Sequence, residues 1–285
     1  MNIYLTLTRT FFKILSKVAP HLAGSLAFHL FQKPRTKAIR TIEKSFYDQV
    51  TSYKIETPIE SVDCYELGNK QGKLIILVHG WESNAGSFAA ISASLANQGY
   101  RVVLFNLPAH GISKLKKANI MSCSRVLASV LTYFQYSGPI SIISHSFGSA
   151  VCTYTLATTR VPIDKFIMLT TPDKLIDIFT DFKHMISLGD VAFNKMLDDV
   201  KELFGRDPGT VAVNQMTKMI NYNQLSIIHD EYDKVLPYHN SLKVYEKSRN
   251  ANLTTLEKVG HYRMLWNKEV IAMVNNLMRH NQKAA

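Results

Sequence analysis

The serine best placed for covalent chemistry lies in Ser144-His145-Ser146-Phe147-Gly148, between an apolar run (140–143) and a helical pattern (149–158). A sharp turn from a buried strand into a helix exposes the hydroxyl group of its central serine. The residues two before and two after that serine must be small, because neighbouring backbone passes close to them. Gly148 meets this requirement, and Ser144 stands where glycine is usual. The pattern predicts Ser146 as a nucleophile; the alternative is a serine that only caps the helix.

A serine hydroxyl group needs a base to react at neutral pH. Ten histidines could supply it, and His261 has the most suitable position, in a loop between an expected strand (253–257) and the last helix. Such a loop can reach the serine turn, so we predict His261 as the general base. We expect His145, beside the nucleophile, to contact substrate, and His79 and His110 to be structural.

A carboxylate should orient that base and stabilise its protonated form. It should follow the expected strand 225–228, where three acids stand: Asp230, Glu231 and Asp233. Position in the chain leaves Asp230 and Asp233 as alternatives.

The anion formed by attack on a carbonyl carbon needs preorganised N–H donors. The amide of Phe147, at the start of the helix after the nucleophile, is one candidate. The amide of Trp81, in the loop His79-Gly80-Trp81, is the other. We expect the Trp81 side chain to line the substrate pocket.

Strand and helix patterns alternate along the chain and would position these residues. Short apolar runs predict strands at 61–67, 74–78, 101–105, 140–143, 166–169, 225–228 and 253–257, with helical patterns between them. This alternation predicts an α/β fold with a mostly parallel central sheet flanked by helices. Residues 173–223 have helical patterns without a strand and predict a small helical cap. We therefore expect a core of residues 46–172 and 224–285, a cap of residues 173–223 and an N-terminal helical extension of residues 1–45.

The N-terminal extension has apolar residues at helical spacing from Tyr4 to Leu22, with Arg9, Lys13 and Lys17 mostly on another side. A basic amphipathic helix can lie on an anionic membrane. The favoured alternative is that its apolar face packs on its own domain. The charges interrupt any signal-peptide core, and no apolar run is long enough to span a bilayer.

Composition narrows the function classes further. The net charge is +11 and the pI about 9.4, but the basic residues are scattered, so we expect no nucleic-acid partner. Cys64, Cys123 and Cys152 fit neither a metal site nor a disulfide framework, which indicates a reducing, cytoplasmic location. We expect no metal and no cofactor. The oligomeric state stays open.

Together these motifs resemble the α/β-hydrolase superfamily over about residues 59–278. Residues 77–81 are similar to its oxyanion loop, and residues 106–113 to its second loop, with Asn106 and Ala109 in place of Asp and Gly. Residues 229–237 resemble its acid loop, in which the residue matching Asp233 is catalytic. The chain order Ser, Asp, His is also that of the superfamily.

The resemblance implies a triad of Ser146, Asp233 and His261 that cleaves a carboxylic ester of a small or lipid-like substrate through an acyl-enzyme. Thioesters and lactones stay open, because the same triad can serve them. The alternatives are a membrane-peripheral acyltransferase or lipase, and a non-catalytic binding protein with this fold. The membrane alternative depends on the N-terminal basic helix.

Overall fold

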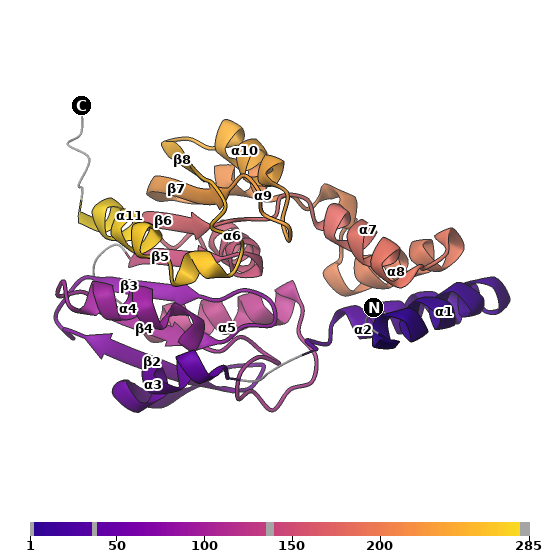
Figure 1. Cartoon of the computed structure of the whole chain (residues 1–285), viewed down its shortest axis with the longest axis horizontal. Coiled ribbons are helices and arrows are strands. Elements are labelled where there is room, and N and C mark those ends of the chain that lie inside the picture. Colours follow the sequence, from indigo (N-terminus) through magenta and orange to yellow (C-terminus); the bar gives the residue numbers. More distant parts are fainter. Residues whose placement is uncertain (1–2, 36–38, 135–139, 280–285) are drawn as a thin grey trace. The chain divides into compact units, whose positions relative to one another are not determined.

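The computed structural model describes residues 3–35, 39–134 and 140–279 (Figure 1). The chain forms two compact units. One comprises Met1–Lys33 and Asp173–Ala212, and the other Pro34–Pro172 and Val213–Ala285. The N-terminal helices and the inserted helices therefore belong to one helical unit, in contrast to the expectation of a separate N-terminal extension and cap.

The larger unit is built on a sheet that contains eight strands within the described residues, in the order β1-β2-β4-β3-β5-β6-β7-β8. The strands β1 and β2 are antiparallel to each other, β2 is antiparallel to β4, and the remaining pairs are parallel. The prediction of a mostly parallel sheet is confirmed. The strands are β1 Thr51–Glu56, β2 Ser61–Gly68, β3 Leu74–Val78, β4 Arg101–Phe105, β5 Ile140–His145, β6 Ile163–Leu169, β7 Tyr222–Asp230 and β8 Ala251–Leu256.

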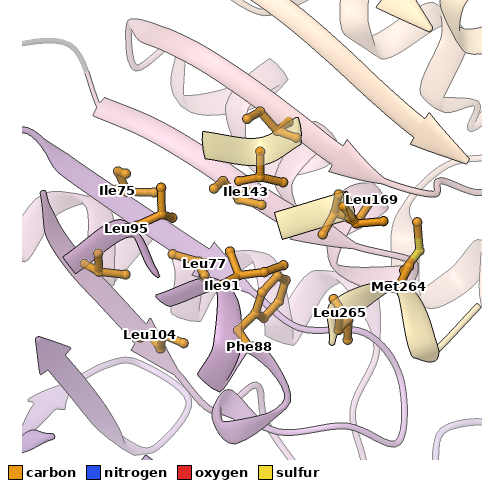
Figure 2. Close-up of a cluster of buried hydrophobic side chains, with 14 of the residues drawn as sticks. Ile75, Leu77, Phe88, Ile91, Leu95, Leu104, Ile143, Leu169, Met264 and Leu265 are labelled. Atoms are coloured by element: carbon orange, nitrogen blue, oxygen red, sulfur yellow. The ribbon is translucent and has the colours of Figure 1, made fainter. Parts of the chain in front are cut away.

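Helices cover both faces of this sheet. Helices α4 (Ala89–Ala96) and α11 (Lys268–Arg279) share a core cluster with one face, in which Ile75, Leu77 and Leu104 contribute from the strands (Figure 2). Alternate strand residues point to the other face, where α6 (Phe147–Thr159) contacts β3 and β5 and packs on α5 (Ile120–Tyr133). Both faces of the central strands are thus buried, which explains their continuous apolar sequences.

Sequence patterns missed three elements of the larger unit. These are β1 and the helices α3 (Thr41–Gln49) and α10 (Tyr238–Lys247). Strand β1 is an edge strand whose residues are mostly exposed, so its sequence lacks an apolar run. Strand β7 begins at Tyr222, inside the range expected for the cap. Short helical turns precede it: η2 Pro208–Thr210, α9 Val213–Met216 and η3 Thr217–Met219.

The helical unit contains α1 (Ile3–Val18), α2 (Pro20–Phe31), α7 (Leu175–Ile186) and α8 (Asp190–Phe204). Helix α2 packs closely on α8 through its small residues Ala23, Gly24 and Ala27, all buried. A Cβ atom on Gly24 would lie 2.3 Å from the Ala192 carbonyl oxygen, so only glycine permits this approach. Helix α1 contacts α2 and α7, and Phe12 is its buried residue.

Candidate active site

Ser146 lies in a strained turn between β5 and α6. Its φ of 54° and ψ of −121° place a residue with a side chain in a region that such residues rarely adopt. The Ser146 amide contacts the carbonyl oxygens of Leu169 (3.2 Å) and Thr170 (3.3 Å), which hold the turn to the end of β6. The surrounding contacts maintain the strain, and the serine keeps 8% of its surface exposed.

Close backbone approaches explain the small residues on either side. A Cβ atom on Gly148 would lie 2.4 Å from the Val78 carbonyl oxygen and 2.5 Å from that of His79, so the start of α6 requires glycine. Ser144 occupies the other position without a clash. Its Oγ is 3.0 Å from Ser149 Oγ and donates to the Ile167 carbonyl oxygen at 3.3 Å. The departure from glycine thus adds buried hydrogen bonds at this position.

His261 connects the serine to a buried carboxylate. Its Nε2 is 3.0 Å from Ser146 Oγ, and its Nδ1 is 2.7 Å from Asp233 Oδ2. An ionised carboxylate only accepts hydrogen bonds, so Nδ1 carries the proton and Nε2 is left to accept from the serine hydroxyl group. This is the tautomer that a general base needs.

The Asp233 carboxylate is well supported in its ionised form. Oδ1 accepts from the amides of Val235 (2.7 Å) and Leu236 (3.1 Å), and His229 Nε2 lies 3.3 Å from Oδ2. Burial would raise the pKa of Asp233, but the hydrogen bonds from His229 and His261 outweigh it and hold the pKa well below its usual range. The sequence does not indicate His229 as a site residue, because no local pattern shows that it reaches this carboxylate.

Asp230, the competing acid, has a different set of contacts. Its Oδ2 accepts from the Gly260 amide at 2.6 Å, and its Oδ1 accepts from the Tyr232 amide at 2.8 Å. The structure thus brings Asp233 to the imidazole of His261 and Asp230 to the backbone that carries it.

His145 is almost completely buried, in contrast to the expectation that it contacts substrate. It is 1% exposed, and its Nε2 donates to the His261 carbonyl oxygen at 2.9 Å. Burial, together with the neighbouring His261, lowers the pKa of His145 to about 3, so this imidazole stays neutral. Its contacts support the loop that carries His261.

The two residues predicted as oxyanion donors lie side by side. The rings of Trp81 and Phe147 are 5.2 Å apart, edge to face. Helix α6 begins at Phe147, so its amide is among the first N–H groups of the helix, which have no acceptor within it. His79 is buried, with its Nδ1 2.8 Å from the Gly80 carbonyl oxygen, and its Nε2 accepts from the Leu107 amide at 3.0 Å. It therefore ties the Trp81 loop to the second loop.

An ion pair that the sequence did not reveal holds the residue after Trp81. Glu82 has a φ of 55°, and its carboxylate accepts from the amide and Nε of Arg35 (2.8 Å each) and from Nη2 (2.7 Å). Burial opposes ionisation of Glu82, but the hydrogen bonds from Arg35 lower its pKa. The two residues are 47 positions apart, and no motif connects them.

Residues 3–35, 39–134 and 140–279 contain no group of three His, Cys, Asp or Glu side chains arranged to hold a metal ion. In the same ranges, no helix has the length and apolar character needed to cross a membrane.

Comparisons with known proteins agree with this architecture. Residues 73–226 match the family model described as the alpha/beta hydrolase fold. Rat protein phosphatase methylesterase 1 is 28% identical over 113 residues, which are 38% of this chain and 29% of the rat protein. The human serine hydrolase-like protein is 27% identical over 135 residues, 45% of this chain and 64% of its own length. The chain thus spans less than two thirds of each of these relatives.

Solved structures share the fold over most of the chain. The Pyrococcus furiosus esterase Pf2001 aligns with a TM-score of 0.65 and 20% identity, covering 87% of this chain and 96% of the esterase. The crystal structure of a membrane phospholipase A, a novel bacterial virulence factor, aligns with a TM-score of 0.66 and 12% identity over the whole of both chains. At these identities the likeness is one of fold.

Proposed function

The chain belongs to the α/β-hydrolase-fold family, and we propose that it is a serine hydrolase that cleaves carboxylic esters. The observation that carries this proposal is the continuous series of contacts from Ser146 Oγ through His261 to Asp233, at 3.0 and 2.7 Å. The family relation supports a hydrolase, and the similarity to proteins named methylesterase and serine hydrolase-like supports ester substrates.

In the first half of the reaction, Ser146 Oγ attacks the ester carbonyl carbon and its proton passes to His261 Nε2. Asp233 stabilises the imidazolium that forms. The amides of Trp81 and Phe147 donate to the oxyanion of the tetrahedral intermediate. The intermediate collapses when His261 returns the proton to the leaving alcohol, and the acyl group stays on Ser146 as an ester.

In the second half, water attacks the acyl-enzyme. His261 accepts a proton from this water and then passes it to Ser146 as the carboxylic acid leaves. The same steps would cleave a thioester, with a thiol as the leaving group, or a lactone, with the ring oxygen as the leaving group.

Labelling with a fluorophosphonate and hydrolysis of short and medium p-nitrophenyl esters test this function. We expect wild-type protein to be labelled, and Ser146→Ala to lose labelling and to hydrolyse roughly 10⁴- to 10⁶-fold more slowly. Ser129→Ala, which removes a serine that bonds only locally on α5, is the control and should retain both. Folded wild-type protein that is not labelled, or activity that survives in Ser146→Ala, would contradict the proposal.

A further inference from the structure

Helix α1 carries a row of large apolar side chains that its own unit leaves uncovered. Ile3, Leu7, Phe11, Ile14 and Val18 are 52–76% exposed, and Tyr4 beside them is 65% exposed. We call these six residues the α1 stripe. A large contiguous patch of exposed apolar side chains marks an interaction site, whereas single exposed apolar residues are ordinary.

The α1 stripe is distinct from the face that packs within the helical unit. At 100° per residue, its six members fall in a sector roughly 100° wide. The packing face is about a third of a turn away, where Phe12 is buried and Leu15 and Ser16 are partly buried. The helix therefore has one apolar face that packs within its own unit and a second, larger one that is exposed. This contrasts with the expectation that the apolar face packs on its own domain.

The positive charge of helices α1 and α2 favours an anionic partner. From Ile3 to Phe31, helices α1 and α2 contain Arg9, Lys13 and Lys17 but no Asp or Glu. Arg9 donates to the Met185 carbonyl oxygen, whereas Lys13 and Lys17 are exposed and lie on one flank of the α1 stripe. Lysines in this position can extend to lipid phosphates while their alkyl chains rest on the apolar surface.

We propose that the α1 stripe docks in the interface of an anionic lipid membrane, with Leu22 and Leu26 of α2 as further exposed apolar contacts. Sixteen residues of α-helix are about 24 Å long, less than a bilayer core of about 30 Å, and the helix carries three cations, so it lies in the interface. A second copy is a poorer occupant. A two-fold contact would bring the flanking lysines of each copy towards each other with no acid on either helix.

Docking does not depend on the hydrolytic step, so binding is measured with Ser146→Ala of the full chain. We expect this protein to co-sediment with vesicles of phosphatidylcholine and phosphatidylglycerol, and at least tenfold more weakly with phosphatidylcholine alone or at high salt. Ile14→Glu should weaken binding at least tenfold. Val191→Glu is its matched control, because Val191 on α8 of the same unit has the same exposure of 57%, and it should leave binding unchanged.

A second pair of variants tests the charge. Lys13→Glu with Lys17→Glu should abolish the preference for anionic vesicles. Lys243→Glu with Lys247→Glu makes the same change in net charge on exposed positions of α10 and should have a smaller effect. Equal losses from both lysine pairs, or from both Ile14→Glu and Val191→Glu, would overturn the proposal. Absence of vesicle binding would also overturn it. If light scattering then shows a dimer that Ile14→Glu converts to a monomer, a second copy of the chain covers the α1 stripe instead.

Discussion

Two acids three residues apart, Asp230 and Asp233, make different contributions at the candidate site. Asp233 accepts hydrogen bonds from two imidazoles and two amides, which favours its ionised form beside His261. Asp230 instead accepts from the amide of Gly260, the residue before His261. One carboxylate therefore contacts the imidazole itself, and the other contacts the backbone that carries it.

Asparagine at each of these positions should separate the two contributions. We expect Asp233→Asn to lower kcat for a p-nitrophenyl ester by about 10⁴-fold, because the amide no longer stabilises the tautomer or the imidazolium. Asp230→Asn should lower the free energy of unfolding in urea by about 1–3 kcal/mol, since it weakens a buried charge-assisted hydrogen bond, with a much smaller loss of kcat. Near-normal turnover by Asp233→Asn would show that Asp233 is not the acid of the triad.

At the scale of elements, the loop after β3 is held in place from two sides. His79 ties it to the second loop, and Arg35 holds Glu82, the residue after Trp81, in a left-handed conformation that is strained for a residue with a side chain. Both contacts restrict the backbone that presents the Trp81 amide. An amide stabilises an oxyanion only if its direction is already set before reaction.

Removal of the Arg35–Glu82 pair should therefore affect turnover more than substrate binding. We expect Arg35→Ala to lower kcat severalfold to tenfold with little change in KM, and Arg35→Lys to restore part of the loss. Lys54→Ala removes an exposed ion pair with Asp63 on β1 and β2 and should leave kinetics unchanged. Steady-state kinetics with one p-nitrophenyl ester measures all three; a pure rise in KM would show that Arg35 acts on substrate binding instead.

For the whole molecule, buried neutral histidines make stability depend on pH. Burial, with neighbouring histidines, lowers the pKa of His79 and of His145 to about 3, whereas an unfolded chain has histidine pKa values near about 6.5. Between these values the unfolded chain binds protons that the folded protein does not. Stability from these residues is therefore complete above pH ~6.5 and is lost as the pH falls towards about 3. The lowered pKa of Asp233 adds a loss of the same sign at still lower pH.

Urea unfolding between pH 7 and pH 4.5 measures this dependence. We expect the free energy of unfolding to fall by on the order of 1 kcal/mol per pH unit for each of the two histidines. His79→Gln should make the slope shallower, whereas His239→Gln, at an exposed position, should not change it. A slope that His79→Gln leaves unchanged would show that other groups cause the pH dependence.

Local sequence patterns predicted the fold class and the first candidates for the site. Continuous apolar runs such as 74–78 and 101–105 indicated buried parallel strands, because each residue packs on one face or the other. The small residues around Ser146, and the loop that carries His261, indicated these two residues as site candidates. Each lies in a turn next to an expected strand and helix, which a short stretch of sequence shows.

In contrast, only the tertiary structure distinguished the contacts of Asp233 from those of Asp230 and placed the His145 side chain against the His261 backbone. It also paired Arg35 with Glu82 and turned the α1 stripe outward. Each of these depends on atoms brought together from distant parts of the chain, which no local pattern encodes.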